Sequence, residues 1–258
     1  MTSPLLDAAF GGRPDRWPLP TPADAHDRWL RAVAAGGQGR YAVALADLIE
    51  LGRCRGPAPR SLAMSTRASF LRQLGGHRSA AGWDGRALLA ADTDVALADA
   101  LIGLAADALG AGRFAASQRL LDRAGAVVES ADDARLPVRL RWVSAELAMV
   151  QGDGVTAVEH AERAVAAAAE FTSLRHRVKS DVVLAAALCS HGEIDRCREI
   201  ADAALGRAGE LGLVPLRWAL ASLLADVGSG AYTTGQVTDV RDTSADTVRH
   251  RGGVWSDR

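Results

Sequence analysis

The chain contains no asparagine and a single lysine, Lys179, so arginine supplies nearly all of its positive charge. This usage is typical of a GC-rich genome, such as that of an actinobacterium. Aromatic residues make up only 5% of the 258 residues. That scarcity argues against a β-sandwich or a β-barrel, because those folds need β-branched and aromatic side chains. Three cysteines, Cys54, Cys189 and Cys197, are too few for a disulfide framework and predict a reducing, cytoplasmic location.

Other absences exclude whole classes of protein. No stretch approaches the ~20 consecutive apolar residues of a membrane span, and the first residues lack the basic and apolar regions of a signal peptide. The net charge of −1 argues against a general binder of nucleic acid or of membrane surfaces. No phosphate-binding glycine loop, nucleophile elbow, metalloprotease motif or Cys-x-x-Cys pair occurs. We therefore predict a protein that is not an enzyme and holds no cofactor, with an enzyme of an unrecognised kind as an alternative.

Alanine is what the chain has in excess, at about a fifth of all residues, which indicates helices packed close together. Glycines recur at intervals of 36 to 40 residues: Gly39, Gly75, Gly112, Gly152, Gly192 and Gly228. Seven residues before each glycine stands an alanine, and these are Ala32, Ala68, Ala105, Ala145, Ala185 and Ala221. Five residues after the first five glycines stands a small residue, in turn Ala44, Ala80, Ser117, Ala157 and Cys197.

These columns have a direct physical meaning. Small side chains on both sides of a turn let two antiparallel helices approach closely, and the glycine between them adopts the left-handed backbone conformation that turns the chain. The repeating unit is therefore an αα-hairpin, stacked about five and a half times. The expected helices span 22–37, 40–53, 61–74, 78–91, 93–110, 113–130, 135–151, 154–171, 173–190, 193–210 and 214–227.

The pattern resembles the tetratricopeptide-repeat (TPR) family over roughly residues 22–228. The resemblance rests on the alanine before the turn, the turns Gly39-Arg40-Tyr41 and Gly112-Arg113-Phe114, and the small residue that opens each second helix. Trp29 and Trp142 lie close to the family's early aromatic position. These repeats are longer than the usual ~34 residues, and most lack the closing proline. The resemblance implies an all-α fold, a right-handed α-solenoid of about five and a half hairpins.

The predicted organisation has three parts. Residues 1–20 form an irregular segment, residues 21–228 form the solenoid, and residues 229–258 form a flexible tail with at most one short helix near Ser244 to Arg251. That short segment is similar to the recognition helix of LuxR-type regulators, although too few residues remain for a helix-turn-helix. We expect Val254 and Trp255 to dock on the last hairpin, because a terminal repeat must cover its open apolar face.

Basic residues open the later hairpins, in the order Arg135, Arg139, Arg141, Arg175, Arg177, Lys179 and Arg217. Arg139 and Lys179 each stand thirteen residues before a repeat glycine, so the two should be neighbours in space. Equivalent positions on successive first helices line the concave face of a solenoid. We therefore predict a groove lined by Arg139, Arg141, Lys179 and Arg217, whose partner is an acidic or C-terminal segment of another protein. The alternative is an ordinary solvated face. The family's known carboxylate clamp pairs lysine with asparagine, so it is not implied here.

The predicted function is that of a non-enzymatic interaction scaffold or adaptor, which presents a concave groove to a peptide or helix of a partner. The alternative is a regulatory protein whose repeats sense a partner and whose tail contacts DNA or a transcription factor. No metal site is predicted, because Cys189, His191 and Cys197 match no common zinc spacing and the packing column explains Cys197. The sequence indicates no oligomeric state.

Overall fold

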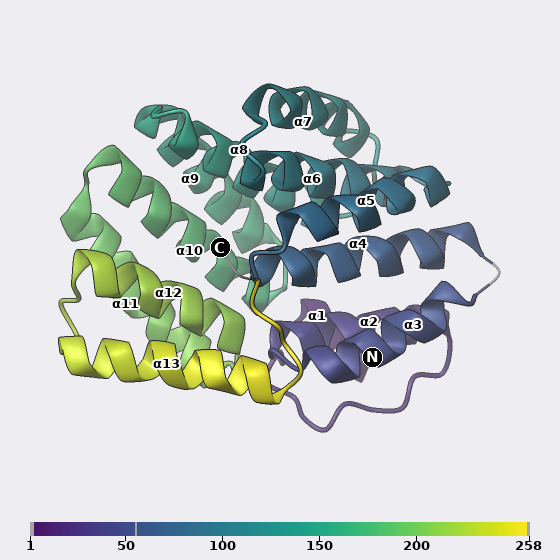
Figure 1. Ribbon diagram of the computed structural model, residues 1–258, viewed down its shortest axis with the longest axis horizontal. Coiled ribbons are helices and arrows are strands. Elements are labelled where there is room, and N and C mark those ends of the chain that lie inside the picture. Colours follow the sequence, from purple (N-terminus) through teal and green to yellow (C-terminus); the bar gives the residue numbers. More distant parts are fainter. Residues whose placement is uncertain (1–2, 55, 257–258) are drawn as a thin grey trace.

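A computed structural model of the chain describes residues 3–54 and 56–256, and within these residues it contains helices and no strands (Figure 1). The helices are α1 (Pro4–Phe10), α2 (Ala25–Gly37), α3 (Tyr41–Gly52), α4 (Pro57–Gln73), α5 (His77–Ala90), α6 (Asp94–Gly110), α7 (Phe114–Val128), α8 (Arg135–Val150), α9 (Gly154–Glu170), α10 (Leu174–His191), α11 (Ile194–Glu210), α12 (Val214–Val227) and α13 (Thr234–His250). From α2 onwards each helix packs on the next, as the predicted hairpins require. The all-helical, solenoid-like prediction is confirmed at this level.

The small-residue columns lie where the helices meet. All six alanines that precede the repeat glycines are fully buried, and so are the five small residues that follow the turns. Ser117 shows why a hydroxyl is accepted in the second column. Its Oγ donates a hydrogen bond of 2.9 Å to the carbonyl oxygen of Ala105, so the buried hydroxyl keeps a partner across the helix pair. Close approach of the two helices thus follows directly from the sequence pattern.

The repeat glycines adopt the predicted backbone conformation, with φ between 73° and 89° at the first five. Gly192 illustrates the turn. It ends α10 in the left-handed region, and its N–H bonds back to the carbonyl oxygen of Cys189 while that of Glu193 bonds to Leu188. A residue with a Cβ would be strained there, so a glycine is the natural end of each first helix.

Both ends of the chain are more regular than the sequence indicated. Residues 4–10 form α1 inside the segment expected to be irregular, and Leu5, Ala8 and Ala9 are buried. At the other end α13 covers 234–250, where we expected a flexible tail with a short helix. A capping box at Thr233 and Gln236 begins this helix. It packs against α12 as the second helix of a sixth pair.

The packing of α13 also bears on the proposed recognition helix. Ser244 and Val248 are buried, and Arg249 pairs with Asp246 on the exposed side. The segment 244–251 thus lies on a helix that covers the end of the array, and nothing in this packing favours the DNA-binding alternative.

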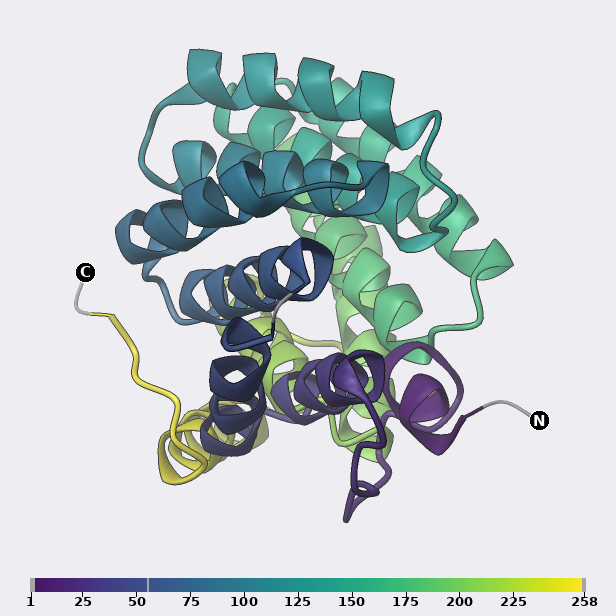
Figure 2. The same cartoon turned by 90° about the vertical axis from the view of Figure 1, so that its right-hand side faces the viewer.

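The array curves until its first and last helix pairs lie side by side (Figure 2). Val248 of α13 belongs to the same apolar core as residues of α1, α2 and α3. The chain after α13 continues this contact, because the Arg251 carbonyl oxygen accepts from the Ala42 N–H (2.9 Å) and the Ser256 N–H donates to the Leu74 carbonyl oxygen (2.8 Å). Trp255 lies against Trp218 of α12, with ring centroids 4.4 Å apart, as expected for a docked tail, whereas Val254 is exposed. The two ends of the array are therefore joined.

Candidate functional site: a cationic cavity on the concave face

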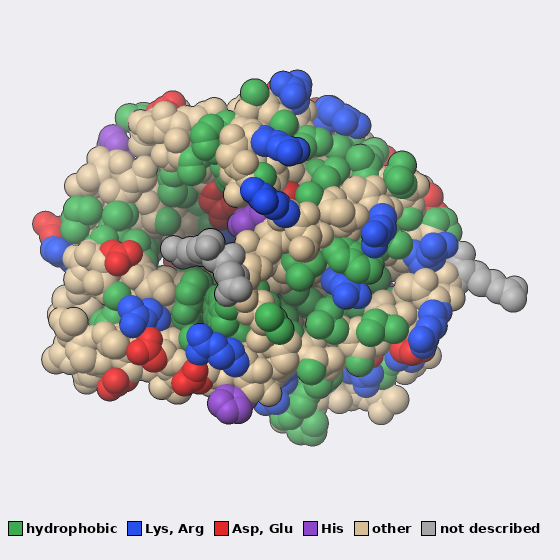
Figure 3. Space-filling view, viewed as in Figure 1, with side chains coloured by type: hydrophobic (Ala, Val, Ile, Leu, Met, Phe, Trp, Pro, Cys, Tyr) green, Lys and Arg blue, Asp and Glu red, His purple; other side chains and the backbone are tan. Residues whose placement is uncertain are grey.

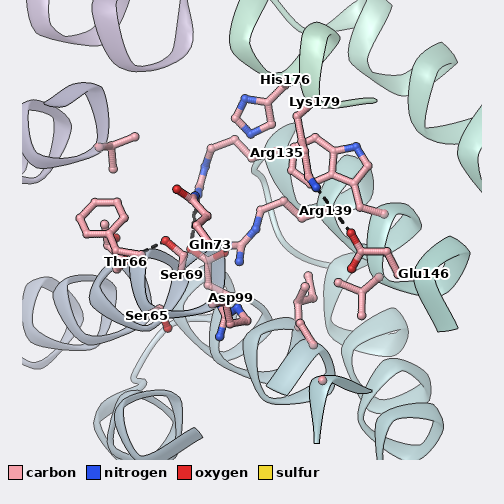
Figure 4. A pocket seen from close by; sticks show the side chains of 18 of the residues that line it. Ser65, Thr66, Ser69, Gln73, Asp99, Arg135, Arg139, Glu146, His176 and Lys179 are labelled. Carbon is pink, nitrogen blue, oxygen red and sulfur yellow. Dashed lines mark hydrogen bonds and ion pairs between the residues drawn. The ribbon is translucent and has the colours of Figure 1, made fainter. Parts of the chain in front are cut away.

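The first helices of the hairpins enclose a cavity of about 480 Å³ (Figure 4). Residues from α2, α4, α6, α8 and α10 line it, together with Phe10 of α1 and His77 at the start of α5. On α8 the lining positions Arg135, Arg139, Trp142 and Glu146 stand 17, 13, 10 and 6 residues before Gly152. This is the spacing of one helix face, and two or three of the same four columns line the cavity from each of α2, α4, α6 and α10. In Figure 3 the molecule is hollowed near the middle of the view, where acidic and histidine side chains are visible.

The cavity is closed at one end and open at the other. Along α8 the exposed fraction of the side chain rises from 8% at Arg135 to 18% at Arg139 and 35% at Glu146. Val150, on the last turn, is half exposed. The closed end is covered by Phe10, whose ring centroid lies 5.4 Å from that of Trp29. We call this closed end, formed by Phe10, Trp29, Arg135, Arg175 and His176, the cavity floor.

Positive charge exceeds negative charge among the residues that line the cavity. The cations are Arg72, Arg135, Arg139, Arg175 and Lys179, and the carboxylates are Asp99 and Glu146. Asp99 serves two guanidiniums at once, because it pairs with Arg139 and lies 3.4 Å from Arg135. Lys179 Nζ lies 3.5 Å from Glu146 Oε1. Among residues 3–54 and 56–256, no carboxylate pairs with Arg175.

Burial and the closeness of these cations lower the pKa values of several basic groups in the cavity. Burial, followed by the neighbouring charges of Arg135 and Arg139, lowers the pKa of Arg175 to about 10. Burial likewise lowers the pKa of Arg139 to about 10, with a further contribution from Arg72. The pKa of His176 falls well below its ordinary value, first through burial and then through the same arginines, so this imidazole is neutral at pH 7. The floor therefore holds positive potential that its own carboxylates do not neutralise.

Aromatic rings form the walls around these charges. Trp142 stacks on His176, with ring centroids 5.3 Å apart and planes inclined by 22°. Hydroxyls of the next hairpin hold the two indoles in place, because Trp29 Nε1 donates to Thr66 Oγ1 and Trp142 Nε1 donates to Ser180 Oγ, each at 2.9 Å. The cavity thus combines flat apolar surfaces with guanidinium donors.

The structure brings together only two of the four basic residues predicted for the groove. Arg139 and Lys179 both line the cavity. Arg141 does not, because two residues along a helix correspond to a rotation of about 200°, which turns its side chain away from Arg139. It lines a separate pocket of about 420 Å³ beside α7 and α9, where its Nη1 lies 3.2 Å from His160 Nδ1. Arg217 of α12 lines neither pocket and lies near Gly209 of α11.

Arg135 and Arg175 also line the cavity, although the predicted groove did not include them. Each stands 17 residues before its repeat glycine, four positions before Arg139 and Lys179 respectively. Positions four apart share a helix face, so this second basic column was the signal for both residues. Asp99 occupies the same column as Arg139 and Lys179, thirteen residues before Gly112, which explains why it reaches Arg139 from the preceding hairpin.

A second charge cluster lies behind the cavity wall, where Arg72 pairs with Asp84 and also, at 3.0 Å, with Asp107. Both carboxylates are almost fully buried. Burial raises the pKa of Asp84, and it raises that of Asp107 to about 7, while the charge of Arg72 opposes both shifts. This cluster ties α4, α5 and α6 together.

The cysteines form no site in the described residues. Cys189 is half-buried on α10, and Cys197 is fully buried on α11, where burial raises its thiol pKa to about 11. All three cysteines are free. Within 3–54 and 56–256 no group of three or more histidine, cysteine, aspartate or glutamate side chains is placed to hold a metal ion. None of the described helices is long and apolar enough to cross a membrane.

No protein-family model matches this chain, and no curated protein is significantly similar to it.

Proposed function

We propose that the protein is a non-enzymatic interaction scaffold, a right-handed TPR-like solenoid whose concave cavity receives an acidic segment of another protein. Support for the TPR-like assignment comes from sequential antiparallel packing, the buried small-residue columns and the glycine turns. Three free cysteines favour a reducing compartment, which we take to be the cytoplasm.

The cationic lining of the cavity carries this proposal. Five basic side chains and two carboxylates line it. Arg72 and Arg135 also pair with carboxylates outside the lining, so Arg175 is the lining cation that no carboxylate of the described residues contacts. Arginine suits such a surface because its planar fork meets a carboxylate with two hydrogen bonds. A partner segment rich in aspartate or glutamate would complete the charge balance, and its affinity would fall as salt screens the attraction.

Direct binding to labelled peptides tests the proposal. A set of fluorescein-labelled acidic peptides, matched with versions in which glutamine and asparagine replace the acids, would be titrated with the protein in a fluorescence anisotropy assay. We expect the acidic versions alone to bind, more tightly at 50 mM than at 300 mM NaCl.

Two charge reversals then locate the binding surface. Lys179→Glu changes the cavity near its mouth, whereas Arg141→Glu makes the same change of charge on the other side of α8. Arg139 is avoided because its loss would leave the buried Asp99 with one cation fewer. We expect Lys179→Glu to weaken binding at least tenfold, about 1.4 kcal/mol, and Arg141→Glu to leave it unchanged. Equal effects of the two variants, or binding that ignores the acidic residues, would refute the proposal.

A further inference from the structure

We propose that the cavity floor is a binding site for a carboxylate carried on a flat aromatic body, with Arg175 as its principal partner. This inference rests on the same cavity as the proposed function, and it names the chemical group that the floor takes.

Arg175 carries a positive charge that no carboxylate of the described residues balances. Buried charges in proteins are almost always paired, and the other deep arginines follow that rule, since Arg72 and Arg135 each contact two carboxylates. Arg175 has none among the described residues, and its Nε is buried without a hydrogen-bond acceptor. Its guanidinium lies 5.7 Å from the Phe10 ring centroid, a contact that stabilises a cation without neutralising it. The floor therefore has donors and charge to spare, and an anion would use both.

The geometry around Arg175 favours a planar oxyanion. Arg135 and Arg175 occupy the same column of successive hairpins, and both line the cavity. Arg139 lies one turn further along α8 than Arg135 (Figure 4). Arg135 lies 5.1 Å from the ring centroids of both Phe10 and Trp29. Arg135 donates its own N–H groups to Asp133 and Asp99, so it contributes charge to the floor, and the free donor for a carboxylate is that of Arg175.

The walls determine what the carboxylate is attached to. The rings of Trp29 and His176 at the floor, and the ring of Trp142 next to His176, line the cavity. Because His176 is neutral at pH 7, its stack with Trp142 offers an uncharged flat surface. Flat apolar surfaces of this kind pack best against another ring. The volume of about 480 Å³ lies in the range of small-ligand pockets, so it suits a small aromatic acid or a single terminal residue of a peptide.

Calorimetric titration with 2-naphthoate tests the site, with the neutral 2-naphthamide as the matched probe. We expect naphthoate to bind at least tenfold more tightly than the amide at 50 mM NaCl, and to weaken when the salt is raised to 500 mM. Equal affinity for the two probes, or no binding of naphthoate, would overturn the proposal.

Arg175→Met separates a binding role from a structural one. Removing Arg175 leaves no carboxylate orphaned and relieves repulsion from Arg135 and Arg139, so we expect an unchanged or higher melting temperature together with at least tenfold weaker naphthoate binding. Arg141→Met, on the outer side of α8, is the matched control and should change neither. If Arg175→Met lowers the melting temperature and leaves naphthoate affinity unaltered, Arg175 is a structural residue and the proposal is wrong.

A third arm distinguishes the two sources of such a carboxylate. A short glycine peptide ending in phenylalanine would be titrated with a free and with an amidated carboxyl terminus. Tighter binding of the free-acid peptide than of naphthoate assigns the floor to a chain terminus, and the reverse order assigns it to a small organic acid. Both orders support the site, provided that Arg175→Met abolishes the preference for the acid.

The outcome is independent of the test of the proposed function. If acidic peptides bind in a manner that depends on Lys179 while naphthoate does not bind, the anion site at the floor is refuted and the scaffold proposal stands. If naphthoate binds through Arg175 and no acidic peptide binds, the scaffold proposal alone fails.

Discussion

Replacing Arg72 by methionine provides a demanding test of how the second and third hairpins are held together. The substitution keeps an unbranched apolar stem but removes the only cation that contacts both Asp84 and Asp107 among the described residues. Those carboxylates are 0% and 1% exposed, so no water replaces the lost partner. Breaking a buried ion pair in this way costs about 3–5 kcal/mol, and we expect a loss of that size at pH 8.

The loss should depend on pH with a defined sign. In the unfolded chain both carboxyl groups ionise near pH 4, whereas in the folded variant they keep their protons to a higher pH. The folded state then binds more protons, so stability falls as the pH rises from about 4 through 8, by up to about 1.4 kcal/mol per pH unit for each group. The unsubstituted protein has the same sign, because the pKa of Asp107 is already raised to about 7. Urea unfolding followed by circular dichroism at pH 5 and pH 8 measures the difference.

Arg196→Met is the matched control. Arg196 also lies between two carboxylates, Glu193 at 2.7 Å and Glu162 at 3.5 Å, but all three side chains are at least 35% exposed. Water and salt screen such a pair, so its loss should be within the scatter of the measurement. Equal costs for the two variants, or a cost for Arg72→Met that is the same at pH 5 and pH 8, would show that the reasoning about burial is wrong.

Two further predictions concern packing. Gly103→Ala should destabilise the protein in urea unfolding, because the added methyl would overlap the Asp84 carboxylate, whereas Gly125→Ala, which meets open space on α7, should stabilise it by about 0.5–1 kcal/mol through helix propensity. The same sign for both would contradict the packing argument. Trp255→Ala should lower the melting temperature by several degrees, at about 2–4 °C per kcal/mol for a chain of this size, and should loosen the joined ends. Val254→Ala, at a side chain 79% exposed, should have no effect, and a shift as large as that of Trp255→Ala would argue against a docked tail.

The sequence predicted well what is decided within one hairpin. Ala105, Ser117 and Gly112 had to be small or flexible for their two helices to touch, and this requirement recurs in every repeat, so periodicity alone revealed it. The direction in which each helical residue points could also have been deduced from the sequence, because each residue turns the helix by about 100°. Arg141 was placed beside Arg139 because the two are close in sequence, although their rotation about the helix axis separates them.

What escaped prediction depends on contacts between distant parts of the chain. Phe10 and His176 are 166 positions apart in the sequence, and their ring centroids lie 5.8 Å apart. No sequence pattern near either residue predicts that contact. This contact contributes to the lowered pKa of Arg175, because Phe10 also lies beside that guanidinium, 5.7 Å from ring centroid to Cζ, and adds to its burial. The sequence showed the basic columns, and only the fold shows that they end in a blind cavity.

The joined ends have a consequence for how this protein can vary. An open solenoid can gain or lose repeats, because each repeat contacts only its two neighbours. Here the two ends are joined by hydrogen bonds from the Ala42 N–H to the Arg251 carbonyl oxygen and from the Ser256 N–H to the Leu74 carbonyl oxygen. These bonds can form only when the number of repeats between them brings the two ends together. A duplicated or deleted hairpin would shift the chain after α13 away from Ala42 and Leu74 by the length of one repeat, and these hydrogen bonds would be lost. The contact between its two ends therefore fixes the number of repeats in this array, which an open solenoid does not do.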